Sequence, residues 1–148
     1  MKIIIAILIV AVLFLAMQLS VKNAEIDNFE SMFNTTFRSS ITQMSNAFGI
    51  NFDESEESNK HFLYLYAYAG LDKAMFIYDK TSYIENNYLD VALYSLRSYM
   101  DTHSPLLNNG EYSYDYRIYE LISEMQNDLS SKEKAKALYD YLFALSRE

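Results

Sequence analysis

The stretch IIIAILIVAVLFLAMQLSV, residues 3–21, decides the fold class of this 148-residue chain. It carries no charged side chain, and no residue before Gln18 in it is polar. A helix needs about 20 consecutive apolar residues to cross the hydrocarbon core of a bilayer. We therefore predict a transmembrane anchor over residues 1–21 that contacts membrane lipid through residues 3–21.

A cleaved signal peptide is the alternative interpretation of this segment, because it also joins a charged start to an apolar run. Signal peptidase requires small side chains at positions −1 and −3 of the cleavage site. Each candidate exit, after Ala16, Ser20 or Ala24, places a large side chain at position −3. We therefore expect the anchor to be retained in the mature protein.

The charges around the anchor predict its orientation, since Lys and Arg resist translocation more than acidic residues do. Lys2 and the α-amino group precede the apolar run, and Lys22 follows it together with several acids. We expect a single-pass protein of the cell membrane with a cytoplasmic N-terminus and an extracytoplasmic C-terminal domain. The absence of cysteine fits a bacterial or archaeal surface better than a eukaryotic secreted domain.

A second apolar pattern follows the anchor at steps of three or four residues, which is typical of one face of a helix. Its members are Ile26, Phe29, Phe33, Phe37, Ile41, Met44 and Phe48. No Pro or Gly precedes Gly49, so the transmembrane helix is expected to continue into an amphipathic stalk or bundle helix over residues 22–48. We expect this face to pack on its own domain. The alternative is a homo-oligomer formed through Phe29, Phe33, Phe37 and Ile41.

The sequence of residues 49–61 predicts an acidic loop, because it contains four acidic residues from Asp53 to Glu57 inclusive. The loop lacks the glycine and the final glutamate of a calcium-binding loop, so acids near a helix N-terminus explain it better. The next segment, FLYLYAYAGLDKAMFIY over residues 62–78, is apolar on nearly every side of a helix. We expect it at the centre of a soluble bundle rather than in a second membrane crossing, because Asp72 and Lys73 would be costly in lipid.

Three further helices are predicted after residue 78. Ser82 with Glu85, and Ser130 with Glu133, form Ser-x-x-Glu capping boxes, and another helix starts near Ser113. Short links join antiparallel neighbours. The predicted fold is therefore all-α: an N-terminal transmembrane helix that continues into a long amphipathic helix, followed by a small up-and-down helical bundle over residues 62–148.

Composition excludes several classes of function. Twelve basic against 20 acidic residues give a net charge of −8 with no basic cluster, which argues against nucleic-acid binding. Without cysteine there is no thiolate nucleophile and no zinc site of the Cys type. Glu57 and His61 share a helix face at i, i+4 but lack a third ligand, and His103 lies in a predicted turn, so we expect ordinary surface residues. We expect no enzyme, no cofactor and no metal.

Tyrosine is the residue type that stands out. All 14 tyrosines lie between Tyr64 and Tyr141. In the segment EYSYDYRIYE, helical spacing spreads the aromatic side chains over more than half of the circumference, so some are exposed beside an arginine. Exposed Tyr with Arg is typical of interaction surfaces. The predicted contact residues are Tyr112, Tyr114, Tyr116, Arg117 and Tyr119. The alternative is that tyrosine hydroxyls only line the edge of the core.

The sequence therefore predicts a membrane-anchored, extracytoplasmic helical protein-binding module that serves as an accessory subunit of a membrane or envelope complex. One alternative is a small membrane protein for bacteriocin immunity or phage exclusion. Another is a pilin-like filament subunit, because the long N-terminal helix resembles that of type IV pilins. The Gly-Phe cleavage junction and the following Glu of those proteins are absent here.

Overall fold

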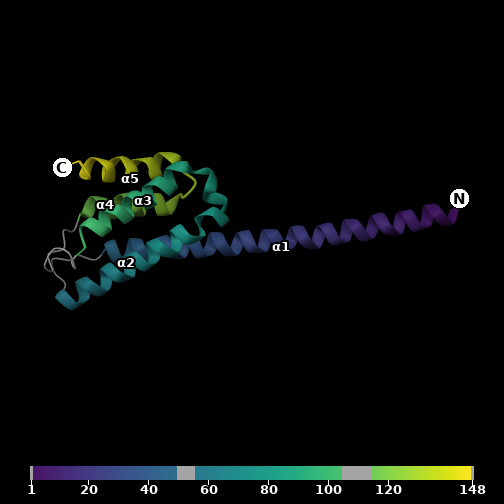
Figure 1. The fold of residues 1–148 in the computed structure, drawn as a ribbon, viewed down its shortest axis with the longest axis horizontal. Coiled ribbons are helices and arrows are strands. Elements are labelled where there is room, and N and C mark those ends of the chain that lie inside the picture. The colour runs from purple at the N-terminus through teal and green to yellow at the C-terminus, as the bar shows by residue number, and fades with distance from the viewer. Residues whose placement is uncertain (1, 50–55, 105–114, 148) are drawn as a thin grey trace. The chain divides into compact units, whose positions relative to one another are not determined.

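The protein is described by a computed structural model that covers residues 2–49, 56–104 and 115–147, with side chains from Leu8 onward except at residues 57 and 58. Its helices are α1 (Lys2–Phe48), α2 (Glu57–Ile77), α3 (Asn87–Thr102), α4 (Tyr116–Asn127) and α5 (Lys132–Leu145). Two 3-10 helices, η2 (Tyr78–Lys80) and η3 (Ser82–Glu85), join α2 to α3. The described residues contain no strand, and the predicted all-α class is confirmed (Figure 1).

The chain divides into two compact units, Met1–Met32 and Phe33–Glu148. In the first unit the described apolar side chains are all exposed, from Leu8 to Val21. This part of α1 is long and apolar enough to cross a membrane, and no other helix among the described residues meets that criterion. The division lies after Met32, so residues 22–32 of the predicted stalk belong to the same unit as the apolar segment and not to the bundle.

The second unit, Phe33–Glu148, is the helical bundle. The last part of α1 runs antiparallel to α2, because Asn34 hydrogen-bonds to Ser82 whereas Gln43 donates to the Tyr66 carbonyl. The α4 helix also runs antiparallel to α1, since Gln126 donates to Thr42 at one end and Tyr119 lies against Gly49 at the other. These pairings are those of an up-and-down bundle.

The amphipathic face of α1 packs on its own domain, as expected, from Phe33 onward. Phe37, Ile41 and Met44 are fully buried, whereas Ile26 and Phe29 in the first unit are exposed. The alternative of a homo-oligomer through Phe29, Phe33, Phe37 and Ile41 stays a prediction, and the burial of Phe37 and Ile41 argues against it. Phe37 and Ile41 lie in the core of one copy. They could contact a second copy only if the bundle unfolded.

The helix at the centre of the bundle is α3 and not α2, which corrects the prediction for residues 62–78. Six α3 side chains are buried, and they pack against both α2 and α5; they are Leu89, Ala92, Leu93, Leu96, Tyr99 and Met100. The α2 helix lies along the lower edge of the bundle in Figure 1. It buries Ala67, Leu71 and Ala74 on one side and leaves Phe62 and Phe76 exposed on the other. The apolar composition on nearly every side of α2 therefore did not predict that this helix lies at the edge of the bundle.

Glycine at position 70 allows α1 and α2 to approach closely. A Cβ atom added there would lie 2.8 Å from the Ser40 carbonyl oxygen and 3.1 Å from the Met44 backbone nitrogen. Ser40 is buried at this contact, and Ala67 and Ala74 extend the line of small side chains on α2. Backbone atoms cannot rotate away as a side chain can, so the position requires glycine.

The helix starts differ from the predicted capping boxes. Ser82 belongs to η3, and α3 begins after Asn86. The cap of α5 is Ser131, whose hydroxyl accepts from the Lys134 backbone, one residue later than Ser130. Glu57 starts α2, so the predicted loop over residues 49–61 is helical in its last five residues. Ser113 lies outside the described residues.

Replacing Gly70 with alanine tests the close approach of α1 and α2. We expect Gly70→Ala to lower the free energy of unfolding by about 1–2 kcal/mol, because overpacking against backbone exceeds the gain in helix propensity. Thermal or urea unfolding of the full chain in detergent, followed by circular dichroism, measures the change. Ser98→Ala, at an exposed site on α3, is the control and should shift stability by less than about 0.5 kcal/mol. Equal effects of the two variants would contradict the packing argument.

Candidate functional site

The predicted tyrosine surface is only partly formed by the described residues. Tyr112 and Tyr114 lie outside them. Tyr116 is 56% exposed at the start of α4, and its ring lies 5.5 Å from that of Tyr119. Arg117 is exposed, but its guanidinium forms an ion pair with Glu120 at 2.8 Å. Tyr119 points inward.

Tyr119 is partly buried because it packs against the end of α1. Its ring edge would lie 2.8 Å from a Cβ atom placed on Gly49, and it contacts the core. This tyrosine therefore matches the alternative interpretation, in which tyrosines line the edge of the core. Of the five predicted contact residues, the structure leaves Tyr116 and Arg117 on the surface.

Asp115 joins the start of α4 to the end of α5. One of its carboxylate oxygens accepts from the Arg117 backbone N–H at 2.9 Å and caps the helix. The other accepts from the Tyr141 hydroxyl at 2.7 Å. This hydrogen bond, helped by desolvation, raises the pKa of Tyr141 to about 12. The Tyr141 hydroxyl on α5 therefore links this helix to the start of α4.

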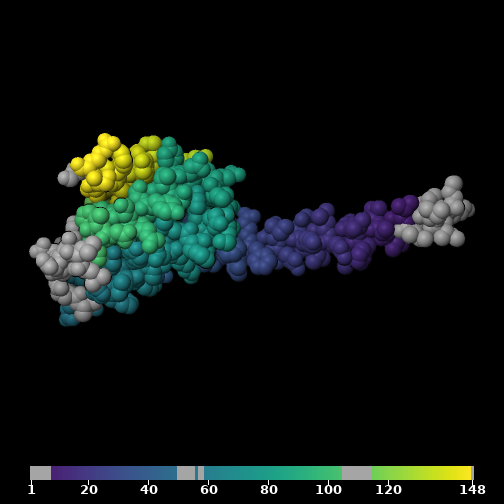
Figure 2. Space-filling model, viewed as in Figure 1, coloured from purple at the N-terminus to yellow at the C-terminus, as the bar shows by residue number. Residues whose placement is uncertain are grey.

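A groove lies between α2, η3 and α3, and both aromatic and acidic side chains line it. The groove has a volume of about 670 Å³. Its apolar side chains are Met75, Phe76, Tyr78, Ile84, Val91 and Tyr94, and its polar ones are Asp79, Asn87 and Asp90. Phe76 is 77% exposed and Tyr94 60%. We call this the α2–α3 groove. Figure 2 shows the teal atoms around the end of α2 and the 3-10 helices at the surface of the bundle.

A second hollow continues the α2–α3 groove along the same two helices and shares Met75, Phe76 and Tyr94 with it. Two of its lining residues form an ion pair, in which the Arg97 guanidinium reaches the Asp72 carboxylate at 2.6 Å. Arg97 also lies over the Tyr68 ring, and the Tyr68 hydroxyl donates to Asp101 at 2.9 Å. These contacts join α2 to α3 along the groove.

The sequence pattern did not predict this groove, because residues 62–78 are apolar on nearly every side of a helix and were expected to be surrounded. One signal was available, since Phe76 falls on the side of the helix opposite to Ala67, Gly70 and Ala74. Which of the two apolar sides would face water depended on the placement of α3.

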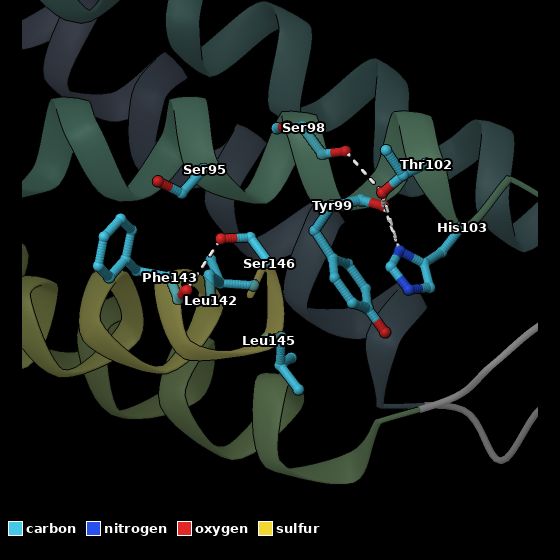
Figure 3. A pocket seen from close by; sticks show the side chains of 9 residues that line it. All are labelled: Ser95, Ser98, Tyr99, Thr102, His103, Leu142, Phe143, Leu145 and Ser146. Carbon is cyan, nitrogen blue, oxygen red and sulfur yellow. Dashed lines mark hydrogen bonds between the residues drawn. The ribbon is translucent and has the colours of Figure 1, made fainter. Parts of the chain in front are cut away.

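A pocket of about 480 Å³ lies between the C-terminal ends of α3 and α5 (Figure 3). Its lining is Ser95, Ser98, Tyr99, Thr102, His103, Leu142, Phe143, Leu145 and Ser146, with no carboxylate among these described residues. His103 stacks on Tyr99 with ring centroids 4.2 Å apart, and its Nδ1 lies 2.9 Å from the Tyr99 carbonyl. The imidazole thus closes the end of α3.

Within the described part of the chain, no group of three or more His, Asp or Glu side chains is placed to hold a metal ion. No protein-family model, no curated protein and no solved structure matches this chain.

The Asp115 bond to Tyr141 predicts a difference in stability that depends on pH. Folding raises the pKa of the phenol above its ordinary value near 10, so the stabilisation is complete below pH 10 and is lost as the pH rises through about 12. We expect Tyr141→Phe to be less stable than wild type by about 1 kcal/mol at pH 7. The difference in stability between wild type and Tyr141→Phe should shrink as the pH rises from 10 to 12. Thermal unfolding at several pH values measures it.

The control is Tyr94→Phe, which removes a hydroxyl from an exposed side chain. It should leave the stability at pH 7 unchanged. A Tyr141→Phe difference that stayed constant up to pH 12 would contradict the assigned hydrogen bond.

Proposed function

We propose that the chain is a membrane-anchored protein-binding module and an accessory subunit of a membrane or envelope complex. The observation that supports this best is the α2–α3 groove, in which Phe76, Ile84, Val91 and Tyr94 are exposed together. Contiguous exposed apolar surface is costly in water, and in folded proteins it marks interaction sites. Aromatic residues at the centre of such a patch supply most of the binding energy at protein interfaces.

The chemistry of the groove indicates the kind of partner. Asp79 and Asp90 lie at its edge beside the apolar side chains, and the whole chain carries a net charge of −8. A complementary partner would insert an apolar side chain between Phe76 and Tyr94 and place Lys or Arg beside the carboxylates. Burial of the apolar side chain would supply affinity, and the charges would orient the partner.

We further propose that the N-terminus is cytoplasmic and the bundle extracytoplasmic, in the cell membrane. Lys2 and the α-amino group before the apolar run support this orientation over the single Lys22 that follows it. The partner would then be a membrane or envelope protein whose groove-binding segment lies on the same side of the membrane.

Site-specific crosslinking tests the groove as a binding site. A photoreactive phenylalanine analogue at Tyr94, in the full chain in intact cells, should give one discrete crosslinked product. Val91→Glu in the same protein should reduce that product at least tenfold, because the groove would then carry a buried carboxylate in the complex. The products are compared by immunoblotting and identified by mass spectrometry.

The matched control places the same photoreactive residue at Ala144, an exposed position on α5. We expect no discrete product from it. The groove is not the binding site if the products from the two positions are the same, or if Val91→Glu leaves the Tyr94 product unchanged while the protein remains folded.

Cysteine labelling tests the orientation, since the natural chain has no cysteine. In intact cells, or spheroplasts where an outer membrane is present, Ala144→Cys should react with a membrane-impermeant maleimide. A second variant carries an added N-terminal cysteine together with Lys2→Arg, which keeps the positive charge. Its cysteine should react with the maleimide only after the cells are permeabilised. Labelling of the N-terminal cysteine alone in intact cells would reverse the proposed orientation.

A further inference from the structure

The α2–α3 groove and the second hollow beside it meet along a shared border. Met75, Phe76 and Tyr94 line both of them, and we call these three residues the shared border. Phe76 and Tyr94 are largely exposed, so the border presents apolar surface to water. A bound segment that covers the border can therefore also reach the groove and the second hollow.

Helices α2 and α3 run antiparallel, which sets the order of side chains along this surface. The Tyr64 hydroxyl on α2 donates to the Met100 carbonyl on α3, and Asp72 pairs with Arg97 nearer the middle of both helices. Phe76 lies one turn beyond Asp72, and the other groove residues on α2 follow it. The second hollow, the shared border and the groove thus follow one another along the two helices.

The second hollow carries an unpaired positive charge. Its charged lining residues are Asp72, Lys73 and Arg97. Asp72 and Arg97 neutralise each other, because their carboxylate and guanidinium lie 2.6 Å apart. Lys73 is exposed, and it forms no ion pair with any residue that the structure describes.

The groove carries an unpaired negative charge. Asp79 and Asp90 line it, whereas none of its lining residues in the described ranges is Lys or Arg. Asp79 lies 3.3 Å from the Lys80 ammonium group. Asp90 is half-buried and has no cationic partner in the described part of the bundle. Charges of opposite sign therefore lie at the two ends of the shared border.

We propose that this surface binds an extended segment of the partner in which a basic, an apolar and an acidic side chain follow one another on one face. The apolar side chain lies on the shared border, the basic one beside Asp90 and the acidic one beside Lys73. This inference rests on the proposed partner site and adds the order of charges to it. A segment with two basic or two acidic side chains would place like charges opposite each other at one end.

The spacing of the charges fits an extended segment. Lys73 precedes Phe76 by three residues and Asp90 precedes Tyr94 by four, so the two charges lie about 4.5 and 6 Å from the border along the helix axes. In an extended chain, side chains on one face recur about every 6.6 Å. Three alternate side chains of the partner, charged, apolar and charged, therefore match the three levels of the surface.

Photocrosslinking with defined peptides tests the order of charges. The probes are Lys-Ser-X-Ser-Glu, Lys-Ser-X-Ser-Lys and Glu-Ser-X-Ser-Glu with blocked ends, where X is a photoreactive phenylalanine analogue. The target is the full chain in lipid nanodiscs. We expect the peptide with one charge of each sign to give about threefold more product at Phe76 and Tyr94 than either of the others. This preference should disappear in about 1 M salt, since the Debye length falls to about 3 Å.

Two charge reversals should change the preference in opposite directions. Lys73→Glu should make the peptide with two lysines the best probe, and Asp90→Lys should make the peptide with two glutamates the best. A general loss of structure would not produce both results. Glu124→Lys, at an exposed site on α4, is the control for the charge change of Asp90→Lys and should keep the wild-type preference.

Equal yields from the three peptides would overturn the charge order, and would be the result if lipid covered this surface. A preference that neither Lys73→Glu nor Asp90→Lys altered would also overturn it. The Tyr94 product in cells and its loss in Val91→Glu do not depend on these peptides. A cellular product without a peptide preference would therefore contradict the charge order alone, and a peptide preference without a cellular product would contradict the proposed function alone.

Discussion

The close approach of α1 and α2 at Gly70 is the constraint on which the rest of the bundle depends. Ser40 presents its backbone carbonyl where a side chain on α2 would otherwise be, and only a missing Cβ leaves room for it. The two helices then come near enough for Gln43 to reach the Tyr66 carbonyl and for Asn34 to reach Ser82. These contacts fix the rotation of α2, and the rotation decides which of its two apolar sides faces water.

Tyrosines complete the bundle by joining one helix to the next. The Tyr64 hydroxyl donates to the Met100 carbonyl, and Tyr78 donates to the Asn86 carbonyl. Burial raises the pKa of Tyr78 to about 12, which keeps its donor proton in place across the physiological range. Tyr83 accepts from Arg38 at 2.6 Å and ties the 3-10 segment to α1. Many of the tyrosines therefore serve the architecture, with their rings in the core and their hydroxyls at its edge.

The functional proposals follow from the aromatic residues that this architecture does not use. The same fixed rotation of α2 that buries Leu71 leaves Phe76 and Phe62 exposed, and Tyr94 on α3 is exposed beside Phe76. Phe76 thus borders the α2–α3 groove together with Tyr94.

The sequence by itself determined the all-α class, the long apolar N-terminal segment and the end of α1 before Gly49, because these depend on local helix propensity, run length and glycine. It also predicted that the α1 face around Phe37 packs on its own domain, since its period of three to four residues is visible along the chain. Only the tertiary structure decided that α3 is central and that Tyr119 turns inward. Whether an apolar side chain is buried depends on the elements distant in sequence that cover it, and helical periodicity carries no information about those elements.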